Sequence, residues 1–459
     1  MSILIQNGIL VLPTGPIQAD LRVAGGRIAE LGPGLAPGAS RVIDAQERLV
    51  FPGFIDTHTH FEMNKGFPNE TADDWYTGTR AALAGGTTTV LDFAEPERGA
   101  TLASALETWH GRADGAACCN YGFHMTVKDW SPSIRSELRE MTAAGVTSYK
   151  VYLAYDNLRL SDAAAYEVVK AVGAEGGVVG CHCENGDLVT EGIRAQQAAG
   201  NLSPAAHPLS RPPAVEAEAV GRWLTIAELA GCPVNIVHLS TLRGLEAVRA
   251  ARTRGQRLYV ETCPQYLLLD ESVYFNEDYS AAARYVCAPP LRDKAEQEHL
   301  WKGLRRGAIQ TVSTDHCSFT LAQKDMGRED FTKIPGGLPG VETRGELLYS
   351  YGVAKRKISA AQMCRVLSEN PARLYGLYPR KGVLRPGSDA DIVVYDPGAS
   401  HVIRAEDCVA NVDYNPYEGF VTAGGIRQVW LRGQLSVENG KVLVEAPAGK
   451  YMARGKNSL

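Results

Sequence analysis

The alternation of apolar strand candidates with helical segments from residue 51 onward is the feature that most constrains the fold of this chain. Eight short apolar runs are strand candidates, and they are, in chain order, FPGFIDTH, TTTVLDF, YGFHMTV, TSYKVYL, GVVGCHC, VNIVHLS, RLYVETC and IQTVSTD. Apolar residues at helical spacing predict helices between them, over residues 131–144, 161–172, 214–230 and 242–252. Eight strands with intervening helices predict an α/β fold, the (β/α)8 TIM barrel.

The two ends of the chain have a different pattern. Residues 3–50 alternate short apolar runs with turns such as PTGP and AGGR, and similar turn-bounded strands return in GVLRPGSDADIVVYDP and IRQVWLRGQLSVENGKVLV. Such alternation is typical of a small antiparallel sheet. We therefore predict a smaller, discontinuous β-sandwich domain formed by residues 1–50 and about 380–445, a barrel over 51–379, and a C-terminal tail over 446–459.

Charge and cysteine content narrow the possible functions. The 47 basic and 52 acidic residues give a net charge of -5 without any basic run, which argues against nucleic-acid binding. The first residues lack the positive charge with which a secretory signal peptide begins. No apolar run reaches the roughly 20 residues that a membrane-spanning helix needs. Ten scattered cysteines without a CxxC pair favour reduced thiols and a metal site of His and carboxylate ligands. We expect a soluble, cytoplasmic protein that acts on a small, neutral or weakly charged molecule.

Polar residues with ligand atoms stand at the ends of several predicted strands. His58 and His60 lie two residues apart, so strand alternation points both side chains to the same face. His182, His238 and Asp315 end the fifth, sixth and eighth strand candidates. Each of these alone is compatible with an ordinary polar residue at a strand end. Because the carboxyl ends of barrel strands converge on one face, the five together predict a metal centre.

Lys150 ends the fourth strand candidate, where an ordinary ammonium would be repelled by metal ions. Its amine, kept neutral by desolvation, could instead capture carbon dioxide and become a carbamate, an anionic ligand able to bridge two ions. The alternative is an ordinary lysine paired with a carboxylate. The five neighbouring ligand candidates favour the carbamate.

Other candidate residues near these strand ends receive structural interpretations. Cys181 and Cys183 flank His182, but strand alternation turns both towards the opposite face, so we expect core residues. His316 is turned away from Asp315 by the same rule, and at most supports it through a hydrogen bond. His124 is expected to be structural. No role is assigned to His110, His207, His299 and His401.

A set of motifs spread in order over almost the whole chain resembles one enzyme family. The set includes FPGFIDTHTHFEM, GTRAALAGGTTTVLDF, SYKVYLAY, CHCENGDLV, NIVHLS, ETCPQYLLLD, APPLR, STDHCSF, KIPGGLPGVETR and GSDADIVVYDP. Together they are similar to the cyclic amidohydrolase branch of the amidohydrolase superfamily, and within it to the dihydropyrimidinase and hydantoinase group, phenylhydantoinases included. The resemblance implies hydrolytic ring opening of a cyclic amide such as hydantoin, a 5-substituted hydantoin or a dihydropyrimidine.

The same resemblance implies a cofactor and an assembly. It implies two Zn²⁺ ions per chain, with Mn²⁺ or another divalent ion as an alternative, and carbon dioxide bound as the carbamate of Lys150. The implied ligands are His58, His60 and Asp315 for one ion, and His182 and His238 for the other. A hydroxide bridging the two ions would attack the ring carbonyl, Tyr155 would donate a hydrogen bond to the carbonyl oxygen, and Asp315 would carry the proton. A homotetramer is the implied assembly.

The substrate-binding residues implied by the resemblance are Tyr155, Ala288, Gly336, Met63, Phe67 and Tyr152. Gly336 replaces a usual Asn, and Ala288 stands in APP where many relatives have SPP. Lys65 and Arg159 are either cations near the substituent of the ring or solvated loop charges.

The chain departs from related groups near the metal motif. Dihydroorotases usually carry Arg two residues after the HxH pair, where this chain has Glu62. If Glu62 faces the pocket, it repels a carboxylate on the ring. Allantoinases typically lack the tyrosine that matches Tyr155. Allantoinase, dihydroorotase and a non-catalytic metal-binding scaffold stay open as alternatives.

Overall fold

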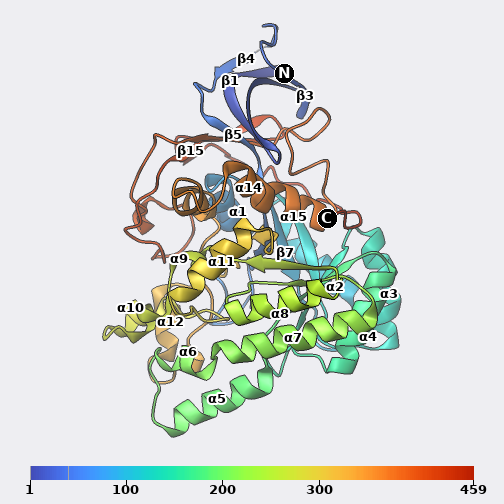
Figure 1. The fold of residues 1–459 in the computed structure, drawn as a ribbon, viewed down its shortest axis with the longest axis vertical. Helices are drawn as coiled ribbons and strands as arrows, with labels where there is room; N and C mark the ends of the chain where they lie inside the picture. Colours follow the sequence, from blue (N-terminus) through green and yellow to red (C-terminus); the bar gives the residue numbers. More distant parts are fainter. Residues whose placement is uncertain (1, 40) are drawn as a thin grey trace.

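The computed structural model describes residues 2–39 and 41–459. A sheet built from both chain ends lies at one end of the molecule, and the helices of the central part of the sequence form the rest (Figure 1). Among the described residues, no helix is long and apolar enough to cross a membrane.

The central part of the chain forms the predicted barrel. Its parallel strands are hydrogen-bonded in the order of the sequence. They are β6 (Phe54–Thr59), β7 (Thr87–Ala94), β8 (Asn120–Thr126), β9 (Ser148–Tyr152), β10 (Val178–His182), β11 (Val234–Ile236), β12 (Leu258–Thr262) and β13 (Thr311–Val312). The chain beyond β13 closes the ring on β6, because the amide of His60 donates to the carbonyl of His316 at 2.8 Å and the amide of His316 donates to that of His58 at 3.2 Å. Each predicted strand run overlaps one of these strands, which confirms the TIM barrel.

The helices begin where capping residues stand in the sequence. Ser131 accepts a hydrogen bond from the amide of Ile134, which satisfies one free donor of the first turn of α3. The four predicted helices match α3, α4, α7 and α8 to within two residues. The α-helices are α1 (Trp75–Ala84), α2 (Leu102–Ala113), α3 (Pro132–Ala143), α4 (Asp162–Ala174), α5 (Gly186–Ala198), α6 (Ala206–Ser210), α7 (Pro213–Ala230), α8 (Leu242–Thr253), α9 (Pro264–Leu268), α10 (Tyr279–Ala283), α11 (Ala295–Arg305), α12 (Leu321–Lys324), α13 (Arg344–Leu348), α14 (Ala360–Cys364) and α15 (Asn370–Leu374).

The two chain ends share one sheet, as predicted, but the sheet is mixed and not purely antiparallel, because β1 pairs in parallel with β4 and β5. Strand β5 joins them, since it pairs in parallel with β1 and antiparallel with β14. The strands are β1 (Ser2–Leu12), β2 (Gly15–Ala24), β3 (Arg27–Gly32), β4 (Arg41–Asp44), β5 (Leu49–Pro52), β14 (Ile392–Asp396), β15 (Gly425–Leu431), β16 (Gln434–Glu438) and β17 (Lys441–Val442).

The run FPGFIDTH, predicted as one barrel strand, is divided between the two sheets. Phe51 and Pro52 belong to β5, and the barrel strand starts at Phe54. Gly53 makes the crossing possible, because a β-carbon there would lie 2.2 Å from the hydroxyl of Thr88. The change of sheet thus depends on a close approach that apolar periodicity does not reveal.

The C-terminal tail packs on its own barrel. The amide of Gly449 donates to Ala117 at 2.8 Å, and that of Met452 donates to Tyr121 at 2.7 Å. Arg454 is buried and donates to the hydroxyl of Ser148 at 2.6 Å. The tail therefore covers the amino ends of β8 and β9, at the opposite end of these strands from their carboxyl ends.

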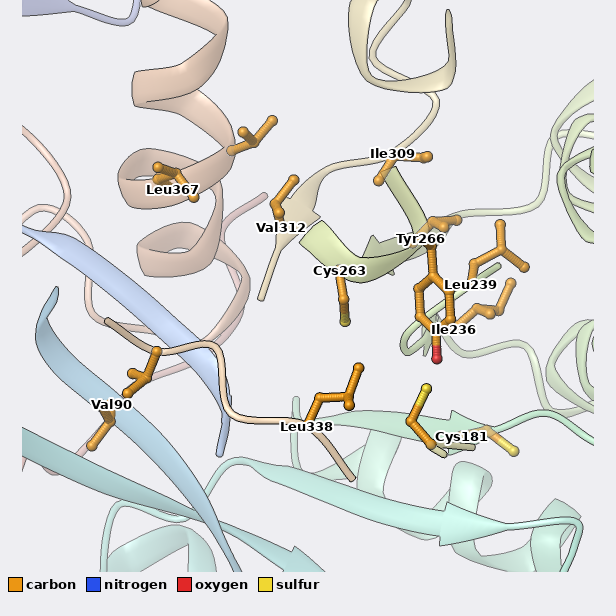
Figure 2. Close-up of a cluster of buried hydrophobic side chains, with 14 of the residues drawn as sticks. Val90, Cys181, Ile236, Leu239, Cys263, Tyr266, Ile309, Val312, Leu338 and Leu367 are labelled. Atoms are coloured by element: carbon orange, nitrogen blue, oxygen red, sulfur yellow. The ribbon is translucent and has the colours of Figure 1, made fainter. Parts of the chain in front are cut away.

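A hydrophobic cluster fills the space around the barrel strands. Figure 2 shows some of its members, including Val90 on β7, Cys181 on β10, Ile236 on β11 and Val312 on β13. Cys183 is buried in the same cluster. Both cysteines flanking His182 are thus core residues, as strand alternation predicts.

Candidate metal centre

The carboxyl ends of the barrel strands bring the six predicted ligands to one place. The cluster has two halves. In the first, Oδ1 of Asp315 lies 3.1 Å from Nε2 of His58 and 3.3 Å from Nε2 of His60. The Nζ of Lys150, on β9, lies 3.5 Å from Nε2 of His58. In the other half, Nδ1 of His182 lies 3.0 Å from Nε2 of His238. Ligand atoms of His58, His238 and Asp315 all lie within 4.8 Å of one another, which links the halves.

The electrostatics of this cluster suit cations. Burial, followed by the positive charge of Lys150, holds the pKa of His58 well below its usual range. Burial also lowers the pKa of His182, His238 and Lys150. Burial opposes the charge of Asp315, but the facing histidines outweigh it and hold that pKa well below its usual range. The neutral imidazoles of His58, His182 and His238 and the carboxylate of Asp315 are donors for divalent metal ions, so the residues fit a metal centre.

Two buried carboxylates orient the histidines from behind. Oε1 of Glu261 lies 2.7 Å from Nδ1 of His58, and Oε2 of Glu184 lies 2.8 Å from Nε2 of His182. Such contacts fix which nitrogen of the ring faces the metal. Sequence reasoning missed both glutamates. The signal was present, because Glu261 stands near the end of the seventh strand run and Glu184 follows the fifth.

Other histidines take the structural positions expected of them. His316 contacts Asp73 through Nε2 at 3.0 Å, and its Nδ1 accepts the amides of Gly340 and Val341. His124 is buried, with Nε2 3.0 Å from the carbonyl of Thr57.

Tyr155 lies beside the second half of the cluster. Its ring centroid is 5.2 Å from that of His182, and the guanidinium of Arg211 lies 5.4 Å from the Tyr155 ring. Arg211 in turn donates to Glu184 at 2.6 Å, and Glu184 contacts His182, so one buried network joins the tyrosine to a predicted ligand. Burial raises the pKa of Tyr155 to about 12, which keeps the hydroxyl protonated as a hydrogen-bond donor. The backbone of Tyr155 has a φ of 68°, a strained value of the kind that gathers at functional sites.

A cavity of about 660 Å³ opens above these residues. Of the predicted substrate-binding residues, it is lined by Met63, Tyr152, Tyr155, Ala288 and Gly336. Phe67 is placed elsewhere: its side chain is 67% exposed, and it lines a neighbouring hollow of about 230 Å³. Phe67 ends a tight turn, since its amide donates to the carbonyl of Asn64 at 2.9 Å, and its side chain is exposed to solvent. Sequence reasoning also gave no role to His207, which lines the main cavity.

Two charged loop residues, Glu62 and Arg159, were expected near the substrate and lie outside the lining of the main cavity. Glu62 is buried and pairs with Lys65, outside the cavity lining. Arg159 also lies outside this lining, and it pairs with Asp156 at 2.9 Å and Asp187 at 2.6 Å. The expected repulsion of a ring carboxylate by Glu62 therefore has no basis in this geometry.

Comparison with known proteins identifies the family. Residues 49–436 match the model of the amidohydrolase family. The chain belongs to this family. The amidohydrolase is 41% identical over 459 residues to a D-hydantoinase of Geobacillus stearothermophilus, covering 99% of this chain and 97% of that protein. It is 40% identical over 458 residues to a D-phenylhydantoinase of Escherichia coli O127:H6, covering 99% and 98% of the two chains. The crystal structure of a dihydropyrimidinase from Brevibacillus agri NCHU1002 superposes with a TM-score of 0.98, 40% identity and 100% coverage of both chains.

These matches confirm the grouping inferred from the motifs. At this identity and coverage the amidohydrolase falls within the hydantoinase and dihydropyrimidinase group. The similarity extends over almost the whole chain, from the mixed sheet to the C-terminal tail.

Proposed function

We propose that this amidohydrolase opens the ring of a cyclic amide by hydrolysis, with hydantoin, 5-substituted hydantoins and dihydropyrimidines as substrates. The observation that carries the proposal is the position of Asp315. Its carboxylate contacts both histidines of the HxH pair, and it lines the same cavity as Tyr155. A proton carrier and a hydrogen-bond donor thus face the space where a substrate would lie.

The proposed cofactor is a pair of Zn²⁺ ions. His58, His60 and Asp315 would hold one ion, and His182 and His238 the other. Lys150, as a carbamate, would contact both ions, which agrees with its buried position next to His58. When bound, the metal ions supply Lewis acidity and activate water near neutral pH.

The residues of the chain would then perform the remaining steps. The protonated hydroxyl of Tyr155 donates a hydrogen bond to the ring carbonyl oxygen as negative charge develops there. Asp315 accepts the proton of the attacking water and delivers it to the leaving nitrogen, which is a poor leaving group without a proton. The main chain at Ala288 and Gly336 would hold the ring imide against one wall of the cavity.

Turnover of hydantoin and dihydrouracil by the metal-loaded protein tests this function. Ring opening is monitored as the loss of the absorbance of the ring, and the metal-free protein serves as the control. A chain that binds two ions and opens none of the rings would be the non-catalytic scaffold.

We also propose a cytoplasmic homotetramer. Support comes from large apolar side chains exposed on successive helices: Leu188 on α5 and Leu209 on α6 are both 52% exposed, and Leu229 on α7 is 72% exposed. Burying these side chains between copies would be favourable. The tail gives no support, because it packs on its own barrel. A monomeric mass by light scattering at micromolar concentration would contradict the assembly.

A further inference from the structure

Lys324 is a buried cation without an acidic partner among the described residues. It ends the short helix α12 and is 1% exposed. Its Nζ donates three hydrogen bonds, all to main-chain carbonyl oxygens: Val286 at 2.8 Å, Pro335 at 2.7 Å and Gly337 at 2.8 Å. The ring of Phe319 lies 5.5 Å from the same nitrogen. Removing an ammonium from water without a carboxylate partner costs desolvation free energy. The three hydrogen bonds of Lys324 have to offset this cost.

The three carbonyls belong to two segments that meet in the wall of the main cavity. Val286 and Ala288 line it from one segment, and residues 335–337 line it from the other. The segments also touch directly, because the amide of Gly337 donates to the carbonyl of Val286 at 3.0 Å. The oxygen of Val286 therefore accepts both from this amide and from the ammonium.

The helix that carries Lys324 is itself well anchored. Thr320 and Gln323 form a reciprocal capping box at its start. The hydroxyl of Tyr279 donates to the carbonyl of Lys324 at 3.0 Å. By contrast, Gly336 and Gly337 give the loop that the ammonium holds more backbone freedom than other residues would. The ammonium thus connects a firmly held helix to a loop that contains two adjacent glycines.

We propose that Lys324 is a positioning residue for the substrate ring. By tying the Val286–Ala288 segment to the Pro335–Gly337 loop, it keeps the main-chain groups of Ala288 and Gly336 at a fixed separation across the ring-binding wall. The residue acts through these segments and lies outside the lining of the cavity. This inference rests on the proposed ring-opening function, which assigns the ring contacts to this wall.

The test is Lys324→Met, which keeps the length and apolar stem of the side chain and removes all three donors. We expect the KM for hydantoin to rise about tenfold or more while kcat and metal content change little. Hydrogen exchange of the amides in residues 330–341 should become faster, since the loop loses its restraint. Lys324→Gln, which keeps some hydrogen-bonding capacity, should give a smaller effect and serves if the Met variant does not fold.

Lys381→Met is the matched control. Lys381 is also buried, and its ammonium pairs with Asp389 at 3.0 Å beside the mixed sheet. Its loss should lower stability and leave both the KM and the exchange of residues 330–341 unchanged. An unchanged KM and unchanged exchange in a folded, metal-loaded Lys324 variant would overturn the inference. If the native protein opens no cyclic amide, the proposed function fails, and the exchange experiment still decides whether Lys324 restrains the two segments.

Discussion

Glu261 sets the direction in which His58 faces. Its Oε1 lies 2.7 Å from Nδ1 of His58, and the opposite nitrogen of that ring lies 3.1 Å from Asp315. Both side chains are almost completely buried. Because the glutamate occupies Nδ1, only Nε2 is left to face the metal centre.

Glu261→Gln should therefore weaken metal binding. Loss of the carboxylate removes the strong partner that fixes the His58 ring, and we expect metal affinity to fall about 10-fold to 100-fold. Competition with a chelator measures this affinity. Glu342→Gln is the control, since the Glu342 carboxylate accepts hydrogen bonds from the amides of Val409 and Ala410 and not from a predicted metal ligand. Equal affinity in both variants would contradict the role of Glu261.

Lys150→Ala should remove much of the bound metal and nearly all activity. The native protein is expected to hold about two divalent ions per chain, with Lys150 contacting both. Metal analysis by mass spectrometry gives the count, and bicarbonate should improve reconstitution of the native apoprotein. Lys128→Ala is the control: Lys128 also lines the cavity, but it pairs with Glu95 at 3.2 Å. Full metal content with normal turnover in Lys150→Ala would rule out the carbamate.

Tyr155→Phe should lower kcat by about a hundredfold or more and leave the metal content intact, as expected for the loss of one donor to a developing oxyanion. Steady-state kinetics with hydantoin provide the measurement. Tyr149→Phe removes a buried hydroxyl on β9 that contacts the carbonyl of Leu138 at 3.5 Å and lies outside the cavity lining, so we expect kcat to change little there. The role of Tyr155 is wrong if the two variants behave alike.

Gly336→Ala and Gly337→Ala should differ although the residues are neighbours. A β-carbon at Gly337 would lie 2.5 Å from the carbonyl oxygen of Cys317, whereas one at Gly336 would meet no atom within 4 Å. We expect Gly337→Ala to destabilise the protein by about 1–3 kcal/mol and to displace the loop. Gly336→Ala should fold normally. Thermal unfolding and kcat/KM compare the two, and equal losses would show that the contact with Cys317 is not decisive.

Neutral rings should be opened much faster than dihydroorotate or allantoin. Lys128 and Arg211 of the cavity wall are already paired, with Glu95 at 3.2 Å and with Glu184 at 2.6 Å, so neither is free for a ring carboxylate. Lys333 also lines the cavity, but its side chain is exposed to solvent, which weakens its pull on a buried carboxylate. Hydantoin, dihydrouracil, dihydroorotate and allantoin should be compared on one zinc-loaded preparation. Arg159→Ala and Lys65→Ala should change little, because both side chains lie outside the main cavity lining. A higher kcat/KM for dihydroorotate or allantoin would exclude the hydantoinase assignment and leave the metal centre intact.

Much of the fold follows from local pattern. The eight barrel strands lie where short apolar runs stand in the sequence, and capping residues such as Ser131 mark where helices begin. His58, His182 and Asp315 could be singled out because parallel barrel strands end on one face, so position along a strand predicts position in space. These features depend on periods of two and 3.6 residues, which a sequence displays directly.

Tertiary structure alone decided which side chains meet across the barrel. Glu261 and His58 are 203 residues apart, and Lys324 reaches back 38 residues to Val286. Glu62 occupies a position that suggests contact with substrate, yet the left-handed backbone there, with a φ of 50°, and its pairing with Lys65 take it out of the cavity wall. Such contacts depend on the close packing of elements distant in the chain and on single backbone angles, and neither leaves a periodic trace in the sequence.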